Sequence, residues 1–441
     1  MAYTETTSTS WFDRLGSSFR GIGFGLVLVI AGTVLLWWNE GSFVATGDAL
    51  NEASSVTQEL GDISKLDTAK NGMLVHAVGP VATRDMLSDP VFGVSINAIR
   101  LERTVEFYQW VEQSKSEKRK KLGGGEETVT TYTYVAKWTN RPVDSSAFKD
   151  PSARTGNRNF TLANMENFKA QATNVAFGAY RLPEFMISSI SGALALNVNL
   201  SEATTAKLNK ELALAAQKAM GGAPQVPQGV VNNVPPQQNS AQNAGQPVPN
   251  AGSQMVHVSG ATVLLSVSPS TPQIGDVRVS FQETRPGTVS LLAKLNGNTF
   301  ETYRASNGKT FSKLSMGTHS LENMYGDAHS SNATMTWILR VVGALLVIVG
   351  LKMIVAPLAV IADVIPLLGS IVGAGAGLVC TLLGLAWSLV IIAIAWLRFR
   401  PLIGGGMLAL AVVLIALLYV KGRSRKATPS PEPVSATETK V

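Results

Sequence analysis

Few residues in this 441-residue chain could carry acid–base or metal chemistry. The chain has four histidines, and none stands in an H-E-x-x-H motif or another common zinc-ligand spacing. The sequence also lacks a G-x-S-x-G nucleophile turn, a Walker A loop and a strand followed by G-x-G-x-x-G. We therefore predict a protein that is not an enzyme, with no catalytic residue, no cofactor and no metal site. The histidines are His76, His257, His319 and His329.

Cysteine content and charge exclude two further classes of site. The single cysteine, Cys380, cannot form an intrachain disulfide, and it excludes the usual cysteine zinc sites. The formal net charge is +7, but residues 39–336 hold 26 Lys/Arg against 25 Asp/Glu. The excess charge therefore flanks the apolar segments, where it sets membrane orientation, and no nucleic-acid face is expected.

Asp363 lies between two apolar segments and could be an ion or proton site. Pro357 and Pro366 stand on either side of it, as they would around a turn at the membrane surface. We predict a turn residue, because no second carboxylate or histidine lies in the spans to complete a proton relay.

Apolar residues make up 46% of the chain and charged residues only 15%, and the apolar excess is concentrated in segments long enough to cross a bilayer of about 30 Å. The predicted fold class is an integral membrane α-helical protein with four spans and a large, strand-rich α+β domain between spans 1 and 2. The third apolar segment could tilt or re-enter, but we favour a single span. The predicted regions are a cytosolic N-terminus (1–20), span 1 (21–38), the ectodomain (39–220 and 255–336), an insertion (221–254), span 2 (337–362), span 3 (366–397), span 4 (401–420) and a basic disordered tail (421–441).

Orientation follows from the Lys/Arg residues beside the spans. Most of these residues fall on the side of the two termini, which predicts cytosolic termini and an ectodomain in the periplasm or a lumen. Arg398 and Arg400 oppose this orientation, and Arg340 is expected to snorkel outward.

Strand signals dominate the ectodomain. Residues 105–111 and 131–138 predict a long hairpin whose polar, glycine-rich connection is residues 112–128. Residues 47–60 predict a short helix capped by Asp48, and Ser201 begins a second helix. The Pro/Gln/Asn-rich insertion is predicted to be disordered. Further strands are expected within residues 256–268, 275–281 and 287–295.

Three groups of residues are candidates for interactions. The stretch Trp37-Trp38-Asn39-Glu40-Gly41 ends span 1 and predicts a membrane interface, with Asn39 and Glu40 as the first hydrated residues. Small-residue spacing predicts close helix packing, either within the bundle or between copies, at Gly21, Gly25, Gly369, Gly373 and Gly377. The hairpin tip is best explained as a solvated charge run, with lipid-headgroup contact as the functional alternative, through Lys118, Arg119, Lys120 and Lys121.

Several of these segments together resemble the LUMA family, that is, transmembrane protein 43 and its bacterial relatives. They are "FGLVLVIAGTVLLWWNEG", "LERTVEFYQWVE", "YTYVAKW", "GDVRVSF", "NATMTWILR" and "WLRFRPL", in the same order along most of the chain. The resemblance implies four spans, a large lumenal or periplasmic domain and no catalytic residues. It implies lamin- or emerin-type partners only if the source is an animal.

The function expected from the sequence is to organise membrane or to scaffold protein and lipid partners through the ectodomain, with the lipid bilayer, self-association or other membrane proteins as partners. A membrane-anchored periplasmic hydrolase and a lipid-binding or transport protein remain as alternatives. The preferred setting is a bacterial inner membrane, and the endoplasmic reticulum or inner nuclear membrane is the other.

Overall fold

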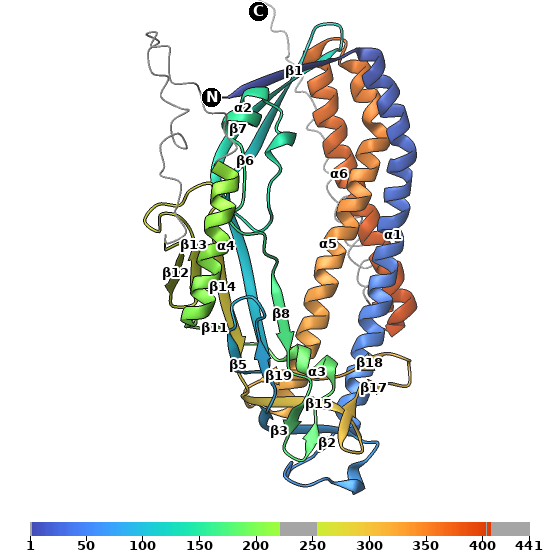
Figure 1. The fold of residues 1–441 in the computed structure, drawn as a ribbon. Coiled ribbons are helices and arrows are strands. Elements are labelled where there is room, and N and C mark those ends of the chain that lie inside the picture. The colour runs from blue at the N-terminus through green and yellow to red at the C-terminus, as the bar shows by residue number, and fades with distance from the viewer. Residues whose placement is uncertain (1, 221–253, 403, 407–441) are drawn as a thin grey trace, which may run out of the picture. The chain divides into compact units, whose positions relative to one another are not determined.

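A computed structural model describes residues 2–220, 254–402 and 404–406 (Figure 1). The described chain divides into two compact units, one made of residues 1–11 and 49–329 and the other of residues 12–48 and 330–441. Most of the predicted insertion 221–254, most of span 4 and the tail 421–441 lie outside the described residues. The helices are α1 (Trp11–Val56), α2 (Pro151–Gly156), α3 (Glu184–Ser189), α4 (Glu202–Met220), α5 (Leu321–Ala362) and α6 (Pro366–Phe399), with short 3-10 turns at Thr68–Lys70 and Ser145–Ala147.

The first unit contains a sheet of eight described strands in the order β1-β7-β6-β14-β13-β12, with β8 added to β6 and β11 added to β14. All of its pairings are antiparallel. Its strands are β1 (Tyr3–Thr9), β6 (Arg100–Lys120), β7 (Glu126–Thr139), β8 (Phe168–Gln171), β11 (Ala193–Ala195), β12 (Val256–Ser259), β13 (Thr262–Leu265) and β14 (Val277–Thr284).

A second sheet in this unit has the order β10-β9-β3-β15-β16, with β19 paired to β15 and β2 paired in parallel to β3. Two small two-stranded sheets complete the described β-structure. The second sheet consists of β2 (Gln58–Glu59), β3 (Leu74–Thr83), β9 (Val175–Phe177), β10 (Tyr180–Arg181), β15 (Thr288–Asn296), β16 (Thr299–Glu301) and β19 (Lys313–Met316), and the small sheets of β4 (Met86–Ser88) with β5 (Ser95–Asn97) and β17 (Tyr303–Arg304) with β18 (Thr310–Phe311).

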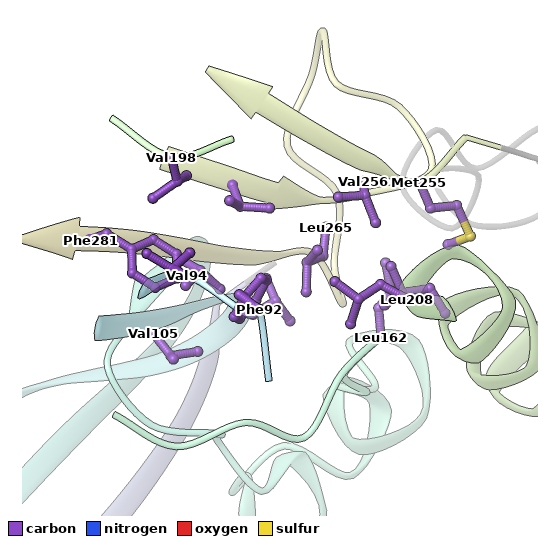
Figure 2. Close-up of a cluster of buried hydrophobic side chains, with 14 of the residues drawn as sticks. Phe92, Val94, Val105, Leu162, Val198, Leu208, Met255, Val256, Leu265 and Phe281 are labelled. Atoms are coloured by element: carbon purple, nitrogen blue, oxygen red, sulfur yellow. The ribbon is translucent and has the colours of Figure 1, made fainter. Parts of the chain in front are cut away.

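The core between the first sheet and α4 follows the alternation seen in the sequence (Figure 2). Phe281 on β14 is fully buried and meets Phe92 edge-on, with ring centroids 5.4 Å apart. Leu208 and Leu212, one turn apart on α4, are buried against the same core, so the predicted helix and strands are confirmed. The predicted cap is confirmed as well, because the Ser201 hydroxyl accepts a hydrogen bond from the Thr204 N–H.

The predicted hairpin is confirmed, but its turn is much shorter than expected. Strands β6 and β7 stay paired from Phe107–Thr139 out to Lys120–Glu126, so most of the predicted polar connection is strand. The turn lies in residues 121–125, where Gly123 and Gly124 adopt the positive φ values that favour glycine. Cross-strand pairing of Lys and Glu stabilises a ribbon that has little apolar surface to bury.

Strand β1 is a feature that the sequence did not predict. Tyr3–Thr9 pairs with β7 over its whole length, and the indole of Trp11 packs against Gly124 in the hairpin turn. Residues 1–20 were predicted to be cytosolic and the hairpin to lie across the membrane. If α1 crosses a bilayer, β1 cannot pair with β7 while residues 1–20 lie in the cytosol and the hairpin lies on the other side. A bilayer cannot divide a strand pair.

The second unit is built from α1, α5 and α6. In the described residues these are the three helices long and apolar enough to cross a membrane. Gly25 meets Gly350 and Gly32 meets Gly343, so α1 and α5 run antiparallel. Thr33 meets Trp387 and Gly41 meets Phe399, so α6 runs parallel to α1. Three apolar helices plus a strand-rich domain confirm the coarser part of the predicted fold class.

Helices α1 and α5 both extend beyond the predicted membrane spans 21–38 and 337–362. Helix α1 continues without interruption to Val56, so Asp48 does not cap the separate short helix predicted for residues 47–60. Helix α5 begins at Leu321, 16 residues before the predicted span. The extra turns are stabilised by packing that local sequence cannot show, since Leu50 and Ala53 share a buried cluster with Met324 and Tyr325. Helix α6 is one continuous helix over the predicted third span.

The β1–β7 register predicts a disulfide. Thr7 and Thr128 are opposite each other, within the Cα separation that a disulfide requires. With Cys380 replaced by Ser, the variant Thr7→Cys/Thr128→Cys should cross-link on mild oxidation in detergent, and Thr7→Cys/Thr139→Cys should not. Mobility on non-reducing gels measures both, and equal yields from the two pairs would contradict the register. The same oxidation in intact membranes tests whether residues 1–20 lie on the same side of the bilayer as the hairpin.

Candidate functional site: the polar junction of helices α1, α5 and α6

Asn39 and Glu40 lie in the middle of α1 and are almost completely buried, with exposed fractions of 2% and 1%. The expectation that they are the first hydrated residues after span 1 was therefore wrong. A buried carboxylate is strongly unfavourable unless it is paired and hydrogen-bonded, so its partners determine what the site is.

Glu40 forms a bidentate ion pair with Arg340 of α5. Arg340 donates from Nε to Oε1 at 2.6 Å and from Nη2 to Oε2 at 2.7 Å. Trp396 of α6 adds a hydrogen bond from its indole Nε1 to Oε2 at 2.8 Å. One carboxylate thus holds three helices through three short hydrogen bonds, two of them within the ion pair.

Aromatic rings surround the guanidinium. The Arg340 Cζ lies 4.7 Å from the ring centroid of Trp337 and 5.8 Å from that of Trp396. Indole faces favour a cation, so these rings stabilise Arg340 where water is scarce. The expectation that Arg340 snorkels outward was wrong, because its charge turns inward to Glu40.

Backbone contacts continue the junction on both sides of the ion pair. Asn39 donates from Nδ2 to the carbonyl of Thr336 at 3.1 Å, and Asn332 donates from Nδ2 to the carbonyl of Phe43 at 3.0 Å. These side chains satisfy carbonyls of neighbouring helices and fix the register of α1 against α5.

The other residues of the Trp37–Gly41 stretch have separate roles. Trp37 packs against Phe399 with ring centroids 5.6 Å apart, and Trp38 remains 58% exposed. A Cβ on Gly41 would lie 2.7 Å from the Phe399 ring, so the glycine permits close approach of α6. The stretch is therefore a helix junction as well as a candidate membrane interface.

A second ion pair joins the opposite ends of α1 and α5. Arg14 donates from Nη2 to Asp363 Oδ2 at 2.6 Å, and Asp363 is 2% exposed in the turn before α6. The turn position of Asp363 is confirmed, and its partner was not foreseen. At 1.5 Å per residue, the two ion pairs are roughly 39 Å apart along α1 and 35 Å along α5. That separation matches the headgroup levels of a bilayer.

The predicted packing glycines differ in their surroundings. Gly25 lies in the tightest α1–α5 contact, whereas the Cβ position of Gly21 has only an ordinary contact with Met353. Gly369 packs on Asp363 in the turn, Gly373 has an ordinary contact with Ala359, and Gly377 has no described neighbour within 4 Å of its Cβ position. The close contact also uses three glycines that the motif search missed, Gly32, Gly343 and Gly350. They were missed because they repeat every seven residues rather than every four.

The hairpin tip carries ion pairs of its own. Lys118 pairs with Glu126 at 3.0 Å and Lys121 with Glu127 at 2.9 Å, while Arg119 lies 3.8 Å from Glu117. Lys120 also has an interaction within the chain. This pairing is what a solvated charge run would show, and contact with lipid headgroups stays a prediction.

The histidines do not converge. His76 is buried and lies 2.8 Å from Glu59 through Nδ1, and its Nε2 lies 3.1 Å from the carbonyl of His319. His257 binds the carbonyl of Ser266. In the described part of the chain, no group of three or more His, Cys, Asp or Glu residues is arranged to hold a metal.

The buried carboxyl of Asp276 is a further titratable group in the sheet unit. Burial raises its pKa to about 6, although the Gln273 N–H donates to Oδ2 at 2.8 Å. No histidine or second carboxylate is recorded in contact with it among the described residues, so it forms no acid–base pair.

Comparison with known proteins identifies the family. The family described as Transmembrane protein 43 matches residues 107–401, about two thirds of the chain. The chain belongs to the transmembrane protein 43 family. Transmembrane protein 43 of rat is 27% identical over 94% of this chain and 93% of its own length, and the human protein is 25% identical over 95% and 94%. The Drosophila melanogaster homolog is 25% identical over 87% and 90%. No solved structure matches significantly.

The resemblance drawn from sequence segments is thus confirmed, and three of those segments supply residues of the junction. Glu40 is the second-last residue of the first segment, Arg340 ends "NATMTWILR" and Trp396 begins "WLRFRPL". Residues from three of the segments on which the resemblance was based therefore meet at one carboxylate in this chain. One signal in the sequence could have revealed this ion pair. An acidic residue at the end of span 1 and an arginine at the start of span 2 lie at the same level when the two spans are antiparallel.

Breaking the ion pair should destabilise the bundle. Glu40→Leu leaves Arg340 buried without its counter-ion, and we expect a loss of about 3–5 kcal/mol in the free energy of unfolding. The double variant Glu40→Leu/Arg340→Leu should recover part of that loss. Denaturant unfolding in detergent micelles measures both. Glu301→Gln, which removes an exposed pair with Lys294, is the control and should cost at most about 1 kcal/mol.

Gly350 tests the close α1–α5 contact. A Cβ there would lie 2.6 Å from the carbonyl oxygen of Gly25, so Gly350→Leu should force the helices apart and cost about 1–3 kcal/mol. Gly23→Leu, at a glycine of α1 with no described neighbour within 4 Å of its Cβ position, is the matched control and should change the free energy of unfolding by no more than about 0.5 kcal/mol. Equal losses from the two variants would contradict the assignment of the contact.

Proposed function

We propose that the protein is a non-enzymatic, four-span membrane protein that organises membrane or scaffolds protein and lipid partners. In this proposal residues 401–420 form the fourth span, and residues 49–220 and 254–329 lie on the far side of the membrane from the cytosol, so β1 does not stay paired with β7 when α1 crosses the bilayer. A bacterial inner membrane, with these residues in the periplasm, is the proposed setting. Lamin- or emerin-type partners apply only if the source is an animal.

The observation that carries the proposal is the two buried ion pairs between helix α1 and the α5 segment, roughly 39 Å apart along α1. Glu40–Arg340 and Arg14–Asp363 each use their charges on one another, at a spacing close to the thickness of a bilayer. Two buried ion pairs at fixed positions disfavour sliding of α1 past α5. Such sliding in either direction would separate the paired charges and leave them unpaired in an apolar layer. A bundle fixed in this way supports a role as a rigid membrane anchor.

The free face of α6 supports association with another helix. Gly375 and Gly377 have no described neighbour within 4 Å of their Cβ positions, and large apolar side chains beside them, such as Leu378 and Leu382, are about 60% exposed. Small residues permit close backbone contact in lipid, so this face fits a second copy or another membrane protein.

The glycines of α6 predict that the protein self-associates. In mild detergent the protein should form oligomers, and Gly373→Leu/Gly377→Leu should weaken them, because the larger side chains prevent close helix contact. Light scattering after size exclusion measures the mass. The matched control is Gly23→Leu, which makes the same change on α1 at a glycine with no described neighbour within 4 Å of its Cβ position. Oligomers of unchanged mass in the double variant would contradict this form of the proposal.

Purification in native lipid tests the scaffold role itself. The full chain, extracted with its surrounding bilayer, should retain defined proteins, lipids or both, which mass spectrometry identifies. Retention of neither would contradict the proposal and favour the hydrolase alternative. Alanine replacement of the four histidines, followed by activity screening, tests that alternative directly.

A further inference from the structure

A groove of about 500 Å³ runs between α5 and α6 in the helix unit. Its polar atoms gather at one end, where Trp337, Arg340 and Trp396 lie. Ser388 also lines the groove, but it is buried and donates its hydroxyl hydrogen to the Gly384 carbonyl of its own helix. The remaining walls are mostly apolar, formed by Val341, Ala344, Leu385, Leu389, Ile392 and Ala393.

The length of the groove along α6 is close to the thickness of the hydrocarbon layer of one leaflet. Along α6 it extends from Leu385 to Leu397, which at 1.5 Å per residue is about 18 Å. The hydrocarbon layer of one leaflet is about 15 Å thick, half of the bilayer core. The polar end lies at the Glu40–Arg340 level, so the groove is polar at a membrane surface and apolar toward the membrane centre, as a phospholipid is.

Positive charge without a described carboxylate partner follows the polar end of the groove along the chain. Arg340 is neutralised by Glu40, but Arg398 and Arg400, which directly follow the groove residue Leu397, pair with no carboxylate within the described chain. Their recorded side-chain contacts are with aromatic rings, Arg398 with Phe399 at 5.8 Å and Arg400 with Phe43 at 5.2 Å. Guanidinium groups bind phosphate oxygens through paired hydrogen bonds.

We propose that this groove is a binding site for an anionic phospholipid. One acyl chain lies between α5 and α6, and the phosphate is held at the mouth by Arg398 and Arg400. The proposal accounts for the two arginines that oppose the orientation predicted from the other basic residues, because a bound anionic headgroup compensates their charge. It rests on the proposed membrane role in one respect only, that α6 crosses a bilayer.

Lipid titration followed by native mass spectrometry tests the site. The full chain is purified in detergent, delipidated and titrated with phosphatidylglycerol or phosphatidylcholine. Wild-type protein should bind one phosphatidylglycerol preferentially. Arg398→Gln/Arg400→Gln should bind it about 30-fold more weakly, which corresponds to about 1 kcal/mol for each cation. Equal affinity of the wild type for both lipids, or unchanged affinity in this variant, overturns the proposal.

A second variant separates the groove from the charges. Ala393→Leu fills the groove wall and should abolish tight binding of both lipids, while Ala374→Leu, an equal change elsewhere on α6, should leave binding intact. If Ala393→Leu binds phosphatidylglycerol as the wild type does, the groove is not the site. Oligomer mass is recorded in the same spectra, so loss of assembly is distinguished from loss of lipid.

The chain's own apolar residues 407–420 follow Gly404, which itself lines the groove, and are the competing occupant. With Cys380 replaced by Ser, Ala393→Cys is combined with a cysteine at each of residues 407–420 in turn. Failure of all these pairs to cross-link supports lipid occupancy. Rapid cross-linking of any pair shows that the chain fills its own groove and overturns the proposal.

Discussion

The Glu40–Arg340 ion pair is the interaction on which the helix unit depends. A carboxylate and a guanidinium at that depth are each too costly to bury alone, so they must meet, and their meeting sets the register of α1 against α5. Trp396 extends the constraint to α6 through its indole N–H. The glycines of α1 and α5 then permit the close backbone contact that this register requires.

The same constraint explains why the helices are longer than their apolar segments. Once Asn39 and Glu40 are satisfied by side chains and backbone of neighbouring helices, nothing ends α1 at the polar residues that follow span 1. The helix continues to Val56, and its last turns bury Leu50 and Ala53 against α5 and the second sheet. Polarity in the sequence therefore marked the end of the apolar segment and not the end of the helix.

Much of the sheet unit was predictable because its signals are local. Alternation of Val277, Val279 and Phe281 placed β14, and the β-rich runs on either side of a glycine-rich connection placed the hairpin. The strand β1 was not predictable: although Thr and Tyr favour strands, Tyr3–Thr9 shows no alternation of apolar and polar residues, and its pairing depends on the edge that β7 offers. Pairing between residues more than a hundred positions apart leaves no local pattern to read.

The sequence by itself determined the apolar spans, the excess charge at their flanks, the strand-rich domain and the resemblance to the transmembrane protein 43 family. Each of these is carried by composition, by period or by short segments in order along the chain. Only the tertiary structure decided that Glu40, Arg340 and Trp396 meet, and that Arg398 and Arg400 are without carboxylate partners in the described residues. The physical reason is that a charged side chain can be buried only where a partner neutralises it or donates a hydrogen bond to it. The partners of Glu40 are about 300 residues away or more in the sequence, so no local pattern reveals them.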